Sequence, residues 1–202
     1  MKTACNAAWE ACRTTNYLDV LKQRGTEIFY NQGSNDNVSP GLVEMGRLFP
    51  QVPVYIVPGG QHGGAKEAGF VKSVGGLPEV DENLRAFALH HFFGTRHMVA
   101  PPQVTTKWDK AAHRLAVKVV FPDHSEPQEN TVWWSVNRHP DYSIAMEFDE
   151  WSSAPLEKTG ADTYSGEVSI TGDVKTLDVI TVHVQEENGS TLTVSSPEFR
   201  LE

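Results

Sequence analysis

The first half of the chain combines short, continuous apolar runs with one amphipathic segment. The runs at 27–30 and 52–57 are rich in β-branched and aromatic residues, and glycine or proline lies close to each of them. Such runs are typical of strands that are buried in a parallel sheet. Residues 40–49, between the two runs, carry apolar side chains at helical spacing, which predicts a short crossover helix. The pattern therefore predicts a βαβ unit.

The second half of the chain has a different pattern. After position 103, apolar and polar residues alternate over short segments, and turn residues such as those at 188–190 separate them. This alternation is typical of strands with one buried face. Six or seven such strands without a helical segment predict a β-sandwich of immunoglobulin-like type. The expected strands are 114–121, 131–139, 142–151, 163–170, 177–186 and 192–201.

Two adjacent prolines, Pro101 and Pro102, separate the two patterns, because proline ends helices and stiffens linkers. A helix is expected at 80–93, with Asp81 as its cap and Gly94 at its end. The expected fold class is α/β plus all-β, with no hydrophobic core that crosses the linker. We therefore predict two domains and a linker between them, at 1–98, 103–202 and 99–102.

Each strand of the predicted βαβ unit ends in a polar loop that contains a candidate residue for acid–base catalysis. The first loop offers Asp36, and the second offers His62. Catalytic groups of open α/β sheets collect at the carboxyl ends of the strands, so these two residues are the candidate catalytic pair. The alternative interpretation is that Asp36 caps the crossover helix and that His62 is a solvated loop residue.

The two loops, GSNDNVSP and VPGGQHGG, resemble the acid loop and the histidine loop of the α/β-hydrolase superfamily. The 26 residues from position 36 to position 62 allow one helix and one strand between them, as in that fold. The resemblance implies that Asp36 orients and stabilises His62, and that His62 is the general base for a nucleophile. It also implies that the helix at 80–93 is the closing helix of the fold.

The nucleophile of that superfamily is not recognisable in this sequence. It belongs in a G-x-S-x-G turn after an earlier strand, and the chain contains no such pattern. We therefore expect the carboxy-terminal part of a serine hydrolase that acts on an ester or amide and is inactive alone. A sheet that is cut at this point exposes the edge of its first strand, which predicts self-association or pairing with a complementary chain.

The second half carries a weaker resemblance of its own. The order WWSVNRHPDY, YSGEVSI and SSPEFRL is similar to the tail of the PhoPQ-activated pathogenicity-related proteins, in which a β-rich segment follows an α/β-hydrolase core. This resemblance would extend over nearly the whole chain. The alternative function is a non-catalytic binding module, in which the sandwich recognises a saccharide or a protein surface.

Composition and charge narrow the range of partners. The chain has 202 residues and a formal net charge of −9, which disfavours nucleic acids and anionic membrane surfaces. No apolar run approaches the roughly 18 residues that cross a bilayer, and the start of the sequence has no signal-peptide pattern. The expected partner of the parent enzyme is a small-molecule ester or amide. The sequence does not indicate the cellular compartment of that enzyme.

Other candidates for metal or cofactor binding carry weaker signals. His90 and His91 are adjacent in the expected helix, where neighbours point about 100° apart, so we expect half-buried helix histidines there. We find no metal-ligand spacing and no glycine motif for phosphate in the sequence, and we predict no metal ligand and no cofactor. Trp133 and Trp134 should send one indole to each face of their strand.

Overall fold

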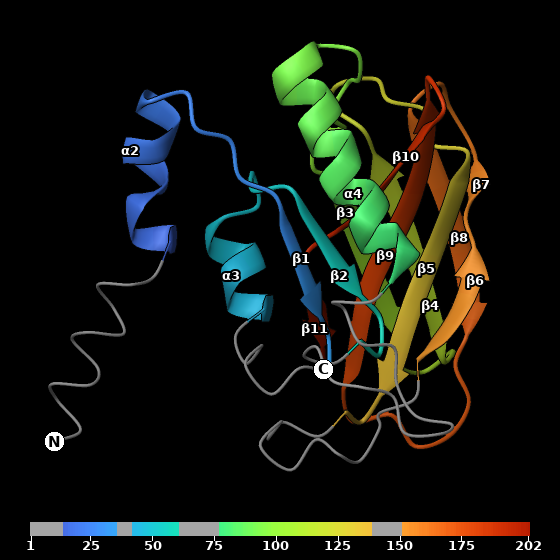
Figure 1. The fold of residues 1–202 in the computed structure, drawn as a ribbon. Coiled ribbons are helices and arrows are strands. Elements are labelled where there is room, and N and C mark those ends of the chain that lie inside the picture. The colour runs from blue at the N-terminus through green and yellow to red at the C-terminus, as the bar shows by residue number, and fades with distance from the viewer. Residues whose placement is uncertain (1–13, 36–41, 61–76, 139–150) are drawn as a thin grey trace, which may run out of the picture.

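The computed structural model describes residues 14–35, 42–60, 77–138 and 151–202, and its strands form two stacked sheets (Figure 1). The larger sheet has seven strands and the smaller sheet has four. Helix α4 (Pro78–Ala88) lies on one face of the larger sheet, and the smaller sheet lies on the other face. The fold is therefore rich in strands and compatible with a β-sandwich.

The larger sheet contains strands from both halves of the chain. Its strands are β1 Tyr30–Gly33, β2 Val54–Val57, β5 Glu129–Val136, β6 Ser152–Pro155, β9 Leu177–Glu187, β10 Ser190–Ser195 and β11 Phe199–Leu201. They run in the order β1-β2-β10-β9-β5-β6, with β11 also paired to β9. Strands β1 and β2 are parallel, and β2 pairs with β10 in the antiparallel sense through Val54 and Ser195. The predicted βαβ unit is therefore joined directly to the later strands.

The smaller sheet is antiparallel throughout. Its strands are β3 Gln103–Asp109, β4 Arg114–Val120, β7 Glu157–Lys158 and β8 Thr163–Ser169. They run in the order β3-β4-β8-β7. In β4 the alternation places Leu115, Val117 and Val119 on the buried face, as the period of a half-buried strand requires.

Helices flank the larger sheet, and none of those that the structure describes is long and apolar enough to span a membrane. Helix α4 starts earlier than we expected. Pro78 occupies its first turn, where the fixed φ of proline suits a helix start, and Leu77 is the residue before it. Asp81 lies within the first turn, so the prediction that it caps this helix is wrong. The other helical elements are η1 Thr14–Tyr17, α2 Leu18–Gln23, α3 Leu42–Leu48 and the π-helical turn η3 Leu89–Phe93.

One buried side chain of α4 continues the hydrogen bonding of the sheet. The amide of Asn83 donates to the Thr193 carbonyl at 2.9 Å, and the Thr193 N–H donates to the Asn83 oxygen at 2.7 Å. The same amide also donates to the side-chain oxygen of Asn31 at 3.1 Å. Asn83 is fully buried, and these contacts fix α4 over β10 and β1.

Two hydrophobic clusters hold the layers together. One fills the space between the two sheets, with Phe121, Leu177 and Leu192 fully buried in it. The other combines residues of the first half and the second half of the chain, namely Val54, Tyr55, Ile56, Val57, Leu77, Val80, Ile180 and Val182. The expectation that no hydrophobic core crosses residues 99–102 is therefore wrong, because strands β2 and β10 are neighbours in one sheet. The domain boundary itself stays a prediction.

Several local predictions can be compared with the described residues. The strand expected at 27–30 lies at 30–33, because pairing with β2 begins where the Tyr30 N–H donates to the Pro53 carbonyl at 3.2 Å. The strand expected at 142–151 falls almost wholly outside the described residues. Trp133 and Trp134 pack against different hydrophobic clusters, so the prediction of one indole on each face is confirmed.

Candidate functional site

The candidate site lies where the parallel strands β1 and β2 end. The Ser34 N–H donates to the Val57 carbonyl at 3.0 Å, and the Asn35 N–H donates to the Gly60 carbonyl at 2.8 Å. The Gly59 N–H donates to the Ser34 hydroxyl oxygen, also at 2.8 Å. Ser34 and Asn35 are both buried. The first residues of the two loops that leave the sheet are therefore held against each other.

The glycines at the end of β2 are required by this close approach. Gly59 has a φ of 71°, in the left-handed region that favours glycine. A Cβ atom on Gly60 would lie 2.8 Å from the Cβ of Val57, which is too short for a carbon–carbon contact. The sequence Pro-Gly-Gly thus lets β2 turn sharply beside β1.

A buried arginine from the second half of the chain supports this pair of strand ends. Arg138, just after β5, donates to the Ser34 carbonyl and to the Glu198 carboxylate. The side chains of Arg138 and Glu198 are 0% and 1% exposed, so this ion pair is shielded from water. A buried pair of this kind depends on accurate geometry, because each charge has lost its hydration.

Trp151 completes the contacts around Arg138. The guanidinium carbon lies 5.4 Å from the centre of a Trp151 ring, within the range of a cation–π interaction. The Trp151 indole N–H donates to the Asn35 side-chain oxygen at 3.1 Å. Arg138 and Trp151 therefore contact both residues at the end of β1, Ser34 through its carbonyl and Asn35 through its side chain.

Burial dominates the electrostatics of Glu198. It raises the pKa of this carboxyl from 4.5 to about 7, while the neighbouring Arg138 opposes the rise. Asp178, which also raises that pKa, is itself bound by Arg200 through two hydrogen bonds of 2.7 and 2.9 Å. Because the folded pKa is raised, the stability from Glu198 is greatest below about pH 4.5 and declines as the pH rises toward 7.

The predicted catalytic residues, Asp36 and His62, lie outside the described residues. Asp36 directly follows Asn35, and His62 comes two residues after Gly60. The described residues nearest to them in the sequence are therefore Asn35 and Gly60, which a hydrogen bond joins. The approach of Asp36 to His62 stays a prediction.

The Ser34 hydroxyl is not available as a nucleophile. Ser34 has no exposed surface, and its oxygen accepts the Gly59 N–H while it donates to the Asn35 side chain at 3.2 Å. A nucleophile needs an exposed oxygen beside a general base. Ser34 is a structural residue of the site, as its place outside any G-x-S-x-G turn suggests.

The sequence pattern did not indicate that Arg138, Trp151 and Glu198 are parts of this site. The sequence separation between Arg138 and Glu198 is 60 residues, and that between Arg138 and Ser34 is 104 residues. No local spacing marks such contacts, because Arg138 follows β5 and Glu198 precedes β11, and both of these strands pair with β9. His90 and His91 were expected to be half-buried helix histidines without a metal, whereas the structure brings both close to Glu27.

A comparison with protein-family models and with curated proteins finds no match to this chain.

Proposed function

We propose that this chain is the carboxy-terminal part of a serine hydrolase that cleaves ester or amide bonds. The observation that carries the proposal is the pairing of two neighbouring parallel strands whose ends share the Asn35–Gly60 hydrogen bond. One end continues into Asp36 and the other into His62. An acid and a histidine that follow adjacent parallel strands match the order of the last two members of an α/β-hydrolase triad.

In this proposal, His62 takes the proton of a serine hydroxyl as general base, and Asp36 holds the imidazole in the correct tautomer. The serine comes from residues or a chain beyond this sequence. Arg138 and Trp151 contribute by fixing the strand end from which the acid loop leaves. In the same proposal, the strands of residues 103–202 form an immunoglobulin-like accessory sandwich.

Exposed apolar side chains support the idea that a partner surface is missing. No residue of α2 is buried, although Val20 and the preceding Tyr17 are apolar and 43% and 45% exposed. Leu48 at the end of α3 is also exposed. Among the described strands, β1 is at the end of the larger sheet. Such surfaces favour association with further strands and helices.

The chain alone should therefore associate, either with itself or with a complementary chain that carries the nucleophile. Light scattering over a range of protein concentrations measures the mass directly. A mass that rises with concentration is expected from the exposed edge and apolar surface. A monodisperse monomer at every concentration would contradict self-association, and a complementary chain would then be the remaining partner in this proposal.

Hydrolysis of a short-chain p-nitrophenyl ester tests the function itself. The chain alone should show the same background rate as its His62→Ala variant, because it supplies no nucleophile. A longer product that includes a G-x-S-x-G turn from the upstream reading frame should hydrolyse the ester. In that product His62→Ala and Asp36→Asn should each lower kcat by about 10⁴-fold.

Two outcomes would contradict the proposal. Turnover by the chain alone that His62→Ala abolishes would show that the nucleophile lies within these 202 residues. Full activity of the longer product after His62→Ala would remove the base from the mechanism, and full activity after Asp36→Asn would remove the acid.

A second candidate, a non-catalytic binding module, is favoured by one cavity on the sandwich. This cavity measures about 520 Å³, and Asn130, Leu156 and Tyr164 are among its lining residues. Its size is typical of sites for small ligands. An upstream reading frame without any G-x-S-x-G turn would favour this function over the hydrolase.

A further inference from the structure

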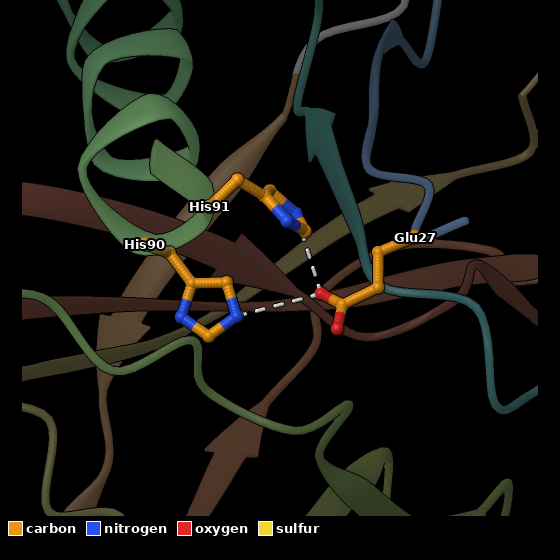
Figure 2. A group of neighbouring side chains, drawn as sticks. All are labelled: Glu27, His90 and His91. Atoms are coloured by element: carbon orange, nitrogen blue, oxygen red, sulfur yellow. Dashed lines mark ion pairs between the residues drawn. The ribbon is translucent and has the colours of Figure 1, made fainter. Parts of the chain in front are cut away.

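Three side chains with metal-binding atoms converge at the end of β1 opposite to the candidate site (Figure 2). Glu27 precedes β1, while His90 and His91 lie on the π-helical turn η3. One oxygen of Glu27 lies 3.6 Å from Nε2 of His90 and 3.4 Å from Nε2 of His91. The ligand atoms of all three residues lie within 4.8 Å of one another.

These distances fit a shared ion better than direct hydrogen bonds. An N–H···O hydrogen bond most often spans about 2.9 to 3.0 Å. Two ligands of a tetrahedral zinc ion, each about 2.05 Å from the metal, are about 3.3 Å apart. The separations of 3.6 and 3.4 Å between Glu27 and the two imidazoles are close to this value.

The contacts of His90 define which of its nitrogens is available. Its Nδ1 lies 2.9 Å from the backbone carbonyl of Arg96, and a carbonyl oxygen only accepts, so Nδ1 carries the hydrogen. In neutral His90 the lone pair is therefore on Nε2, which faces the Glu27 carboxylate. Metal-bound histidines commonly donate their other N–H to a carbonyl in this way. A cation between Nε2 and the carboxylate would remove the repulsion of their lone pairs.

Local structure brings the two adjacent histidines together. They lie in a π-helical turn that ends at Gly94, which has a left-handed φ of 62°. Their ring centres are 4.9 Å apart, and the His91 ring packs against Phe87 at 4.2 Å. The expectation from α-helical geometry that neighbouring side chains diverge therefore does not apply at this turn, and π-helical turns are frequent at functional sites.

The three side chains are open to an incoming ion. The His90 and His91 side chains are 30% and 28% exposed, and that of Glu27 is 56% exposed. Three protein ligands and access for water are typical of zinc sites that keep one open position. A set of two imidazoles and one carboxylate suits transition metals, whereas magnesium and calcium prefer oxygen ligands throughout.

We propose that Glu27, His90 and His91 bind a divalent transition-metal ion, with Zn²⁺ as the best match and water in the remaining position. The site is independent of the proposed hydrolase chemistry, since it lies before β1 and not after it. The bound ion would connect the segment that leads into β1 to η3, the turn that directly follows α4. Metal binding would therefore stabilise the fold of this part of the chain.

Titration of the metal-free full chain with ZnCl₂ tests the proposal, using competition with a fluorescent zinc chelator. His90→Ala, His91→Ala and Glu27→Gln should each weaken zinc binding by about 100-fold. Loss of a residue that only supports a metal ligand lowers metal affinity by about 10- to 100-fold, and loss of a ligand itself should reach the upper end of that range. His113→Asn is the matched control, because His113 is an exposed histidine with a φ of 49°, which asparagine tolerates. This control should bind zinc as the parent chain does.

Thermal unfolding provides a second measurement that does not depend on the chelator. Zinc should raise the Tm of the parent and of His113→Asn, since a ligand of the native state stabilises it. It should raise the Tm of the three site variants much less. Their metal-free Tm values show whether each variant folds, and Glu27→Gln, an exposed and nearly isosteric change, carries the test if a histidine variant does not fold.

Equal zinc affinity in the parent and in Glu27→Gln, His90→Ala and His91→Ala would overturn the proposal. So would a parent chain that binds no zinc, in which case the three residues form an ion pair only. A loss of binding in His113→Asn as large as in the site variants would also overturn it, because the zinc would then be bound elsewhere.

Discussion

Replacing Arg138 by methionine is expected to lower the free energy of unfolding by about 3 to 5 kcal/mol. Arg138 and Glu198 are an ion pair with side chains that are 0% and 1% exposed. Without the guanidinium, the buried carboxyl of Glu198 loses its partner, and the Ser34 carbonyl loses a donor. Removing one partner of a buried pair costs more than the pair itself contributes, because the remaining group stays desolvated.

Urea unfolding with linear extrapolation measures this loss. The matched control is Arg114→Met, which breaks the pair with Glu167 on the surface, where the two side chains are 56% and 62% exposed. That change should cost at most about 1 kcal/mol, since water screens exposed pairs.

The double variant Arg138→Met, Glu198→Gln separates the contribution of the ion pair from that of packing. It should be more stable than Arg138→Met alone, because it no longer buries an unpaired carboxyl. Amide exchange at Asn35 should also accelerate in Arg138→Met, since Arg138 holds the adjacent Ser34 carbonyl. Strictly additive costs in the double variant would contradict the coupling between Arg138 and Glu198.

These contacts explain why the fold was only partly predictable from the sequence. Strand β2 was recognisable because it is buried on both faces, which leaves a continuous apolar run. Strand β4 was recognisable because alternate residues are buried. Strand β1 was displaced in the prediction, since Asn31 and Gly33 are poor strand formers and the apolar run precedes them. Its position follows from pairing with β2, which no local pattern records.

The candidate site also depends on strand pairing between residues that are far apart in the sequence. The Val54–Ser195 pair joins β2 to β10, and the hydrogen bonds of Arg138 link Glu198, near the end of the chain, to the Ser34 carbonyl beside the end of β1. Arg138 and Glu198 meet there, although nothing in their local sequence marks either one. The two histidines of η3 were candidates in the sequence, but α-helical geometry predicted that their side chains point apart.

A buried histidine in the sandwich should make the protein sensitive to acid. His183 in β9 is fully buried, with Nδ1 2.7 Å from the Asn130 side-chain oxygen and Nε2 2.9 Å from the Thr181 hydroxyl. In the neutral form it donates through Nδ1 and accepts through Nε2, so both nitrogens are satisfied. Burial lowers the pKa of His183 from 6.5 to about 3.

The direction of the pH effect follows from this lowered pKa. Between about pH 6.5 and pH 3 the unfolded chain binds a proton at His183 that the folded chain does not. The stability from neutral His183 is therefore fully present above pH 6.5 and declines as the pH falls. At pH 5 this residue alone should lower the free energy of unfolding by about 2 kcal/mol relative to pH 7.

Urea unfolding of the parent and of His183→Gln at pH 7 and pH 5 measures this contribution. Glutamine does not titrate, so the loss of stability between the two pH values should be about 2 kcal/mol smaller in the variant than in the parent. His113→Asn removes an exposed histidine and should leave the parent's loss unchanged. The comparison of losses cancels the carboxyl groups that also titrate in this range, and it cancels any cost of the substitution at pH 7. An equal loss in His183→Gln and the parent would mean that the folded protein accepts a proton at position 183 as readily as the unfolded chain does.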